Sequence, residues 1–130
     1  PYAIDLGDGK QLKVLSKISN EDYRAFIQNV DVGMSLMYAP HPSLLPFELA
    51  LSGAHVITNT FEVRTIDYLR ERVPDIIAFQ PTVDACVEAI RTACQRAMFG
   101  PAAPLSYQKN TWPDVFNNEF FERLGAFVKL

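Results

Sequence analysis

The sequence predicts an α/β fold of the Rossmann-like kind, in which a parallel sheet carries helices on both faces. Short apolar segments alternate with helical patterns along the 130 residues, and this alternation favours parallel strands that are joined by helical crossovers. The run VGMSLM at residues 32–37 is almost continuously apolar, as expected of a strand that is covered on both faces.

The first part of the chain contains a turn, a short strand and a helix. The turn Gly7-Asp8-Gly9 precedes a strand that we predict at residues 12–15. Ser19 then begins a helix as its N-cap, with acidic residues in the first turn. The apolar positions of this helix follow a helical period; they are Tyr23, Phe26, Ile27 and Val30.

The middle of the chain continues with a strand over 32–37, a short helix over 46–52 and a strand over 54–59. Pro46 stands in the first turn of the short helix and Gly53 follows its end. Proline at the start and glycine at the end are the usual asymmetry of a helix.

The second half is predicted to hold a helix over 65–72, which ends before Pro74, and a strand over 75–79. Thr82 caps a longer helix with a helical apolar period. Its apolar positions are Val83, Val87, Ile90 and Cys94.

Residues 99–110 form a predicted surface connection to a last helix. The segment Thr111-Trp112-Pro113-Asp114 is predicted to cap that helix, whose apolar residues are expected to form one buried stripe. This stripe consists of Phe116, Phe120, Leu124 and Phe127.

Length and charge indicate a single domain and argue against a nucleic-acid-binding or membrane-spanning protein. The length suits one domain with its own core, and we assign residues 1–130 to it. The net charge of −3 and the lack of a Lys/Arg cluster give no reason to expect nucleic acid as a partner. No apolar run approaches the roughly 18 residues of a membrane span. The chain begins at Pro1, so we expect it to be a piece of a longer protein.

The cysteines and histidines predict neither a disulfide nor a metal site. Cys86 and Cys94 lie eight positions apart in a helical pattern, which is about 12 Å and beyond the roughly 7 Å that a disulfide spans. We expect both to be free and buried, in a reducing cytoplasm. His41 and His55 have no partner at metal-ligand spacing, so no metal is expected.

The loop 38–45 is the predicted ligand site. In parallel sheets, ligands bind beyond the carboxyl ends of the strands, and this loop leaves such an end and leads into a helix. The free N–H groups and the dipole of a helix start suit a phosphate. Glu48, in the first turn, can accept hydrogen bonds from ligand hydroxyls. A phosphate and a diol together describe a nucleotide.

A plainer interpretation stays open for each of these residues. A glutamate in a first helical turn also serves as a cap and a dipole complement. The prolines at 40, 42 and 46 stiffen a surface loop equally well, and His41 is also typical of an ordinary loop. The chain has no glycine-rich phosphate fingerprint and no nucleophile elbow.

The segment DVGMSLMYAPHPSLLPFELALSGAHVITNTFE, residues 31–62, resembles the donor-site segment in the second lobe of a family 4 glycosyltransferase. Its form is similar to rhamnosyltransferases of the WsaF type. LKVLSKISNEDYRAFIQNVDVG and TWPDVF resemble the flanking strand–helix unit and the tryptophan-led helix that ends this lobe. The resemblance implies a partial C-terminal lobe of a two-lobed, GT-B type enzyme.

The resemblance also implies roles for single residues. Glu48 matches the second acid of the family's Glu-x7-Glu motif, which holds the ribose hydroxyls of the donor. The first acid would fall at position 40, where this chain has Pro40. Ser43 and Leu44 match positions whose backbone amides face the diphosphate.

Three further residues are weaker candidates for the same site. His41, with Ser43, is a candidate for contacts to the sugar or the phosphate. Asn59 and Thr60 follow the next strand and are candidates for lining the same crevice, although Asn59 suits a turn cap equally well.

The family's basic pair for the diphosphate and its acceptor-binding lobe are not found in these 130 residues. In the family's strand order 3-2-1-4-5-6, the chain would hold strands 3 to 6. The edge of the 32–37 strand would then be unpaired. We therefore expect the isolated chain to hide this edge by dimerising, by swapping, or by moving its first strand beside 32–37.

The resemblance implies a retaining glycosyltransferase that passes a sugar from a nucleotide diphosphate, with dTDP-rhamnose favoured, to a growing glycan. The family needs no bound metal, and the isolated chain is expected to be inactive. The full-length protein is expected in the cytoplasm, at most peripheral to the inner face of the membrane. The alternatives are a non-catalytic nucleotide-binding or regulatory domain of the same fold and a receiver-like interaction module. The receiver requires an aspartate after a central strand, where this chain has Tyr38-Ala39-Pro40.

Overall fold

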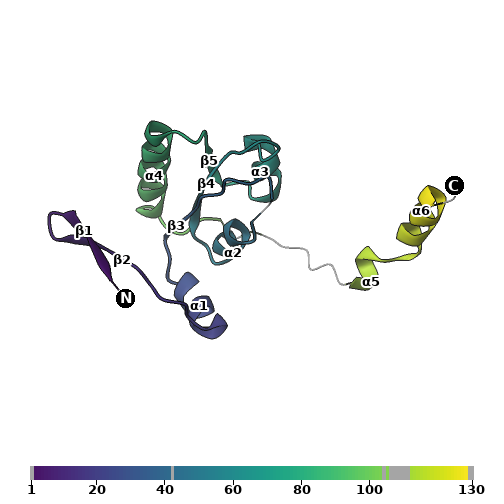
Figure 1. Ribbon diagram of the computed structural model, residues 1–130, viewed down its shortest axis with the longest axis horizontal. Helices are drawn as coiled ribbons and strands as arrows, with labels where there is room; N and C mark the ends of the chain where they lie inside the picture. The colour runs from purple at the N-terminus through teal and green to yellow at the C-terminus, as the bar shows by residue number, and fades with distance from the viewer. Residues whose placement is uncertain (1, 42, 104, 106–111, 129–130) are drawn as a thin grey trace.

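The computed structural model describes residues 2–41, 43–103, 105 and 112–128. Its centre is a three-stranded sheet in the order β3-β4-β5, and both strand pairs are parallel (Figure 1). The strands are β3 (Val32–Ser35), β4 (His55–Asn59) and β5 (Ile77–Phe79). Helices cross over between them, as the alternating pattern predicts. The predicted α/β fold class is confirmed.

The helices cover the two faces of the sheet. α2 (Leu45–Leu51) packs on β3 and β4, and α3 (Ile66–Arg72) contacts β5. On the opposite face, α4 (Val83–Ala97) crosses β4 and β5. Successive residues of a strand point to opposite faces. Accordingly, Val56 packs in a cluster with Leu49 of α2, whereas Ile57 packs with α4.

Side-chain caps begin two of these helices. The Thr65 and Thr82 side chains accept hydrogen bonds from the third following amide, of Tyr68 and Ala85. Thr82 was predicted as a cap, whereas Thr65 was predicted only as the first residue of its helix. Gly53 follows α2 with φ +89°, a left-handed conformation that glycine adopts at helix ends without a Cβ penalty.

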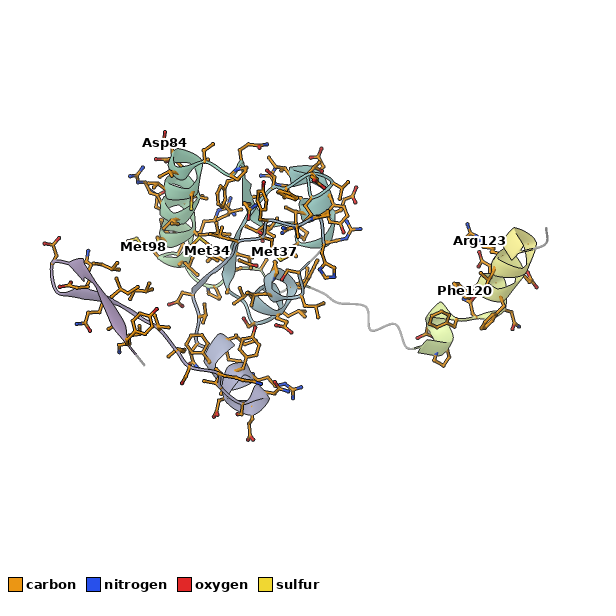
Figure 2. All side chains as sticks on the ribbon, in the orientation of Figure 1. Met34, Met37, Asp84, Met98, Phe120 and Arg123 are labelled. Atoms are coloured by element: carbon orange, nitrogen blue, oxygen red, sulfur yellow. The ribbon has the colours of Figure 1, made fainter. Side chains whose placement is uncertain are left out.

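β3 is exposed on one of its two faces, so the prediction that both faces are covered is wrong. Met34 and Leu36 are 45% and 59% exposed (Met34 is labelled in Figure 2). On the other face Gly33 and Ser35 are buried against α2. The difference arises because α4 packs chiefly on β4 and β5 and leaves the outer face of the edge strand open.

The residues of α4 that pack against the sheet are small. Ala89 and Ala93 are its buried positions, because alanines let a helix approach a sheet closely. The predicted apolar positions of this helix lie on a partly exposed face instead: Val83, Val87, Ile90 and Cys94. Cys94 is exposed and Cys86 is half-buried, so the prediction of two buried cysteines is wrong. Both thiols are free, as predicted.

The N-terminal segment is a hairpin and a helix. β1 (Ala3–Gly7) pairs antiparallel with β2 (Lys10–Lys13), and every residue of both strands is exposed. The strand predicted at 12–15 therefore begins two residues earlier, has a hairpin partner, and is not a strand of the parallel sheet. Ser19 caps α1 (Asn20–Ile27) by accepting a hydrogen bond from the amide of Asp22.

The C-terminal segment consists of α5 (Trp112–Val115) and α6 (Asn118–Val128). Phe120 (labelled in Figure 2) packs edge-to-face against Phe116 and Phe121, with ring centroids 4.8 and 5.4 Å apart. The predicted buried stripe is wrong for Phe116, Phe120 and Leu124, which are 36–45% exposed. The predicted cap residue Thr111, the Phe127 side chain and much of the 99–110 connection lie outside the described residues.

Within the described ranges, no helix is long and apolar enough to cross a membrane. The same residues contain no cluster of three or more His, Cys, Asp or Glu side chains that could hold a metal ion.

Candidate functional site

The carboxyl ends of the three parallel strands meet at one edge of the sheet, where a crevice of about 410 Å³ opens. Leu36, Met37 and Tyr38 line it after β3, and Phe79 and Val83 line it between β5 and α4. The wall is thus largely apolar. Tyr38 is 90% exposed and its ring lies 4.6 Å from that of Phe61, centroid to centroid.

Asn59 lies in this crevice, but its amide group binds the backbone. Its Oδ1 accepts a hydrogen bond from the Met37 amide, and its Nδ2 donates to the Met37 carbonyl, both at 2.8 Å. Nδ2 also donates to the carbonyl of Thr60 at 3.0 Å. The Asn59 side chain thus hydrogen-bonds to Met37 as a paired strand residue would, and extends the β3–β4 pairing beyond Ser35.

Thr60, the neighbouring candidate, is similarly occupied. Its amide and its hydroxyl both donate to the carbonyl of Phe79, at 2.8 and 3.3 Å. The residue is buried. Thr60 therefore ties the end of β4 to the end of β5, and presents no free donor to the crevice.

The loop between β3 and α2 places the remaining candidates near the start of a helix of seven residues. His41 and Leu44 are exposed. The Leu44 carbonyl accepts from the amides of Phe47 and Glu48, and the Ser43 hydroxyl accepts from the Leu45 amide at 3.3 Å. The amides of Ser43 and Leu44 donate to no described residue.

Glu48 faces a groove between α1 and α2 that measures about 710 Å³. The Tyr23 hydroxyl donates a hydrogen bond to Glu48 Oε2 at 2.8 Å. Burial, this hydrogen bond and the carboxylate charge together raise the pKa of Tyr23 to about 12, because each of them disfavours the phenolate. The other walls of the groove are formed by Asn20, Arg24, Ile27, Gln28, Leu51 and Ser52.

Tyr23 was predicted only as an apolar position of α1, and its hydrogen bond to Glu48 was not predicted. The one available signal was its hydroxyl: a tyrosine at the start of an apolar stripe brings a donor to the neighbouring element. With this partner, Glu48 does more than complement a helix dipole.

Arg64 is a second residue that the sequence did not reveal. It is 1% exposed and lies just beyond β4, where its backbone closes a turn with Phe61. Its Nη2 donates to Thr58 Oγ1 at 3.1 Å, and the Thr58 hydroxyl donates to the Ser35 carbonyl at 2.8 Å. Burial lowers the pKa of Arg64, and the nearby Tyr68 opposes that effect.

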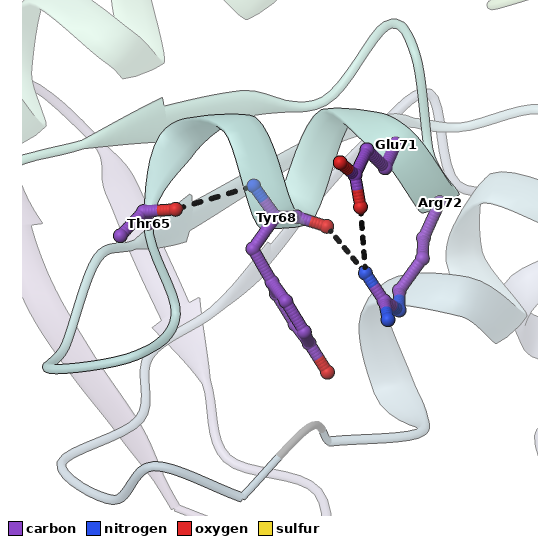
Figure 3. A network of polar contacts seen from close by, with 4 residues as sticks. All are labelled: Thr65, Tyr68, Glu71 and Arg72. Atoms are coloured by element: carbon purple, nitrogen blue, oxygen red, sulfur yellow. Dashed lines mark hydrogen bonds and ion pairs between the residues drawn. The ribbon is translucent and has the colours of Figure 1, made fainter.

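Tyr68 of α3 lines the same small cavity as Arg64, and Figure 3 shows its contacts with Thr65 and Arg72. The Tyr68 amide donates to Thr65 Oγ1 at 3.2 Å, and its carbonyl accepts from Arg72 Nη1 at 2.9 Å. The Arg72 guanidinium carbon lies 3.7 Å from the centroid of the Tyr68 ring, and Arg72 also pairs with Glu71 at 3.5 Å. These contacts fix the tyrosine ring from the solvent side.

The candidate residues thus fall in three neighbouring places rather than in one pocket. Glu48 lies in the α1–α2 groove, Asn59 in the strand-end crevice, and Ser43 beside a small cavity that Arg64 also lines. The first turn of α2 lies between the groove and the cavity. Glu48 lines the groove, and the adjacent Phe47 lines the cavity.

The chain was compared with known families and proteins. The family model described as WsaF, C-terminal domain, matches residues 2–91. The matched range contains Tyr23, Glu48 and Arg64, together with the whole parallel sheet. Among curated proteins, none matches the chain.

Proposed function

The chain belongs to the WsaF C-terminal domain family, and thereby to the glycosyltransferases, and from this we propose that it forms part of the donor-binding lobe of a retaining enzyme. The donor is a nucleotide-diphosphate sugar, with dTDP-rhamnose as the favoured case, and the acceptor is a growing glycan. The upstream lobe supplies the acceptor site and the basic pair for the diphosphate. The enzyme works in the cytoplasm without a bound metal.

The observation that carries this proposal is the placement of Glu48. Its carboxylate faces a groove large enough for a nucleoside, and Tyr23 holds one of its oxygens at 2.8 Å. The other oxygen, Oε1, accepts no hydrogen bond from a described residue. A carboxylate oriented in this way can accept a hydrogen bond from a sugar hydroxyl, and such charge-assisted bonds contribute about 1.5–3 kcal/mol.

The groove also carries the other groups that a nucleoside needs. Asn20 and Gln28 offer amide donors and acceptors, and Ile27 and Leu51 provide apolar surface. A few placed polar groups on an otherwise apolar wall are typical of ligand sites. Arg24 brings a positive charge to the same wall, which supports an anionic ligand.

The exposed edge of β3 supports the proposal that the chain has a partner strand in the active protein. Met34 and Leu36 are exposed beside that edge, and the β1–β2 hairpin pairs only with itself in the sheet pattern of the described residues. The upstream part of the enzyme would cover this edge, and a second copy would cover it when the chain is alone.

The proposal is tested by a sugar-transfer assay on the protein extended upstream to include both lobes. Replacing Glu48 by glutamine should lower kcat/KM about tenfold or more, because the amide removes the charge from the hydrogen bond. Glu71→Gln, which changes an exposed glutamate on α3, should have little effect. Equal transfer in the wild type and in Glu48→Gln would remove Glu48 from the donor site. Nucleotide binding without any transfer would favour the non-catalytic alternative.

A further inference from the structure

The Arg64 guanidinium is buried with part of its hydrogen-bonding capacity unused. Nη2 binds Thr58, but Nε and Nη1 have no hydrogen-bond partner among the described residues. The residue is 1% exposed, so bulk water does not supply the missing acceptors. Arginine keeps its charge at physiological pH even when burial lowers its pKa. Nearly all buried polar groups in proteins find a partner, and a buried charge without one is strongly unfavourable.

No carboxylate of the described residues neutralises this charge. The ion pairs found in the described part of the chain are Arg72–Glu71, Arg91–Glu88 and Arg123–Glu119, all of them exposed. Thr58, whose side chain binds the Arg64 guanidinium, is neutral. An anionic ligand is one group that would supply the missing counter-charge.

The space beside Arg64 shows where such a group can approach. A cavity of about 10 Å³ lies between the first turn of α2 and α3, with Ser43, Phe47 and Tyr68 among its walls. This volume suits at most about one water molecule. Ser43, Phe47 and Tyr68 are half-buried, so they form the side of the cavity nearest to solvent, while Leu69, Val73 and Ile76 close the inner side.

Ser43 is the polar residue of that outer wall on the α2 side. Its hydroxyl oxygen accepts from the Leu45 amide, which leaves its O–H proton available to a ligand. The Ser43 and Leu44 amides are also without a described acceptor. Ser43 lines the same cavity as Arg64, and the Leu44 amide follows it in the same loop. Hydrogen-bond donors on a loop that borders a buried cation suit a tetrahedral oxyanion.

We propose that Arg64 is the fixed cation of a phosphate subsite at Ser43, and that it positions the diphosphate of the donor. This inference rests on the proposed donor function. Arg64 is a positioning residue: its charge acts on the anion through the cavity and the Ser43 segment, in a region where low dielectric strengthens electrostatic attraction. Its tie to Thr58 and Ser35 anchors that charge to the end of the sheet.

The test uses inorganic pyrophosphate and an uncharged nucleoside, thymidine, as separate probes on the same protein. Affinities are measured by calorimetry for the wild type and for R64K, R64Q and R70Q. We expect pyrophosphate binding to weaken at least tenfold in R64Q and less in R64K, which keeps the charge. Thymidine affinity should change less than about twofold. R70Q removes a neighbouring exposed arginine of α3 and should leave both affinities unchanged.

A second measurement needs only the wild type, in case the Arg64 variants do not fold. The Nε–H resonance of Arg64 can be assigned by NMR through its contacts with Thr58 and Tyr68. Pyrophosphate should shift this resonance and slow its exchange with water, and equal ionic strength of sodium chloride should not. An unchanged resonance while pyrophosphate binds would overturn the proposal, and so would an absence of pyrophosphate binding.

The two probes also separate this inference from the proposed function. Glu48-dependent thymidine binding without any Arg64-dependent pyrophosphate binding would overturn the inference alone. Arg64-dependent pyrophosphate binding by a two-lobed protein that transfers no sugar would support the subsite and contradict the enzyme.

Discussion

The two faces of the parallel sheet differ in how completely they are packed and in which groups they carry. On the α2 face, Gly33 and Ser35 are buried, and Arg64 and Thr58 form a polar link to the end of β3. On the α4 face, Met34 is 45% exposed. The candidate site residues Glu48, Ser43 and Arg64 all belong to the α2 side, while the strand-end crevice is largely apolar.

The α2 face is closely packed at β3, whereas the α4 face is packed over β4 and β5 and open only at β3. A closely packed face can hold charged groups at fixed positions, because close-packed surroundings resist rearrangement. The open face is suited to contact with another segment, since exposed apolar surface is removed from water on association.

The tightest point of the α2 face is the contact between β3 and α2. A Cβ added to Gly33 would lie 2.6 Å from Cδ1 of Leu49, and Leu49 is 5% exposed. Gly33→Ala should therefore lower the free energy of unfolding by about 1–3 kcal/mol through overpacking. Urea denaturation followed by circular dichroism measures this value. Stability equal to the wild type would show that the α2 face is loosely packed.

Replacing Asn59 tests whether its side-chain amide stabilises the fold or binds a ligand. Asn59→Ala leaves the amide and carbonyl of Met37 without their partners, which should cost about 1–2 kcal/mol because both groups are only partly accessible to water. Asn29→Ala, which removes an exposed side chain bonded to the Ala25 carbonyl, is the matched control. Intact stability combined with weaker nucleotide binding would instead assign Asn59 to the ligand.

The raised pKa of Tyr23 should make the stability of the α2 side depend on pH. Its pKa is raised from 10.0 to about 12, so the folded protein holds the phenol proton more tightly than the unfolded chain. The resulting stabilisation is complete below pH 10 and is lost as the pH rises toward 12. Ultraviolet titration of the phenolate should show that Tyr23 ionises near pH 12 in the wild type. In Glu48→Gln this transition should move toward pH 10, and an unmoved transition would contradict the link.

The open face should tolerate truncation. Met34→Ala removes a side chain that is 45% exposed and should change the free energy of unfolding by less than about 0.5 kcal/mol, as surface substitutions usually do. The same denaturation experiment compares it directly with Gly33→Ala on the neighbouring position. A loss as large as that of Gly33→Ala would mean that the two faces of β3 are equally packed.

The sequence predicted the elements that local signals define. Thr65 and Thr82 mark the starts of α3 and α4, Gly53 marks the end of α2, and the buried strand β4 follows from its apolar run. Each of these signals acts within a few residues, so neighbouring elements are not needed to interpret it.

Features that depend on distant packing could not be predicted in the same way. The exposure of Met34 depends on where α4 lies, and a helical period fits the alanine stripe of α4 as well as the stripe that contains Val87. The burial of Arg64 depends on α2 and α3 closing over a charged side chain, which composition argues against. The strand β1 was missed because a hairpin of exposed residues has no apolar face that faces a core.

The sequence predicted only those parts of the candidate site that lie within one segment of the chain. The resemblance placed Glu48 and Ser43 in the right segment, while the hydroxyl of Tyr23 and the charge of Arg64 reach them from α1 and from the turn after β4. Tyr23 and Glu48 are 25 positions apart in the sequence, so local sequence signals do not reveal such a contact.

If the Glu48 carboxylate binds a hydroxyl of the nucleotide sugar ring, removal of that hydroxyl and removal of the charge should be coupled. Four dissociation constants measure this coupling, for dTDP and 3′-deoxythymidine diphosphate binding to the wild type and to Glu48→Gln. Removing the 3′-hydroxyl should weaken binding to the wild type about tenfold, which corresponds to about 1.4 kcal/mol. In Glu48→Gln the same removal should change affinity less than about threefold. An equal loss in both proteins would show that the hydroxyl does not contact Glu48.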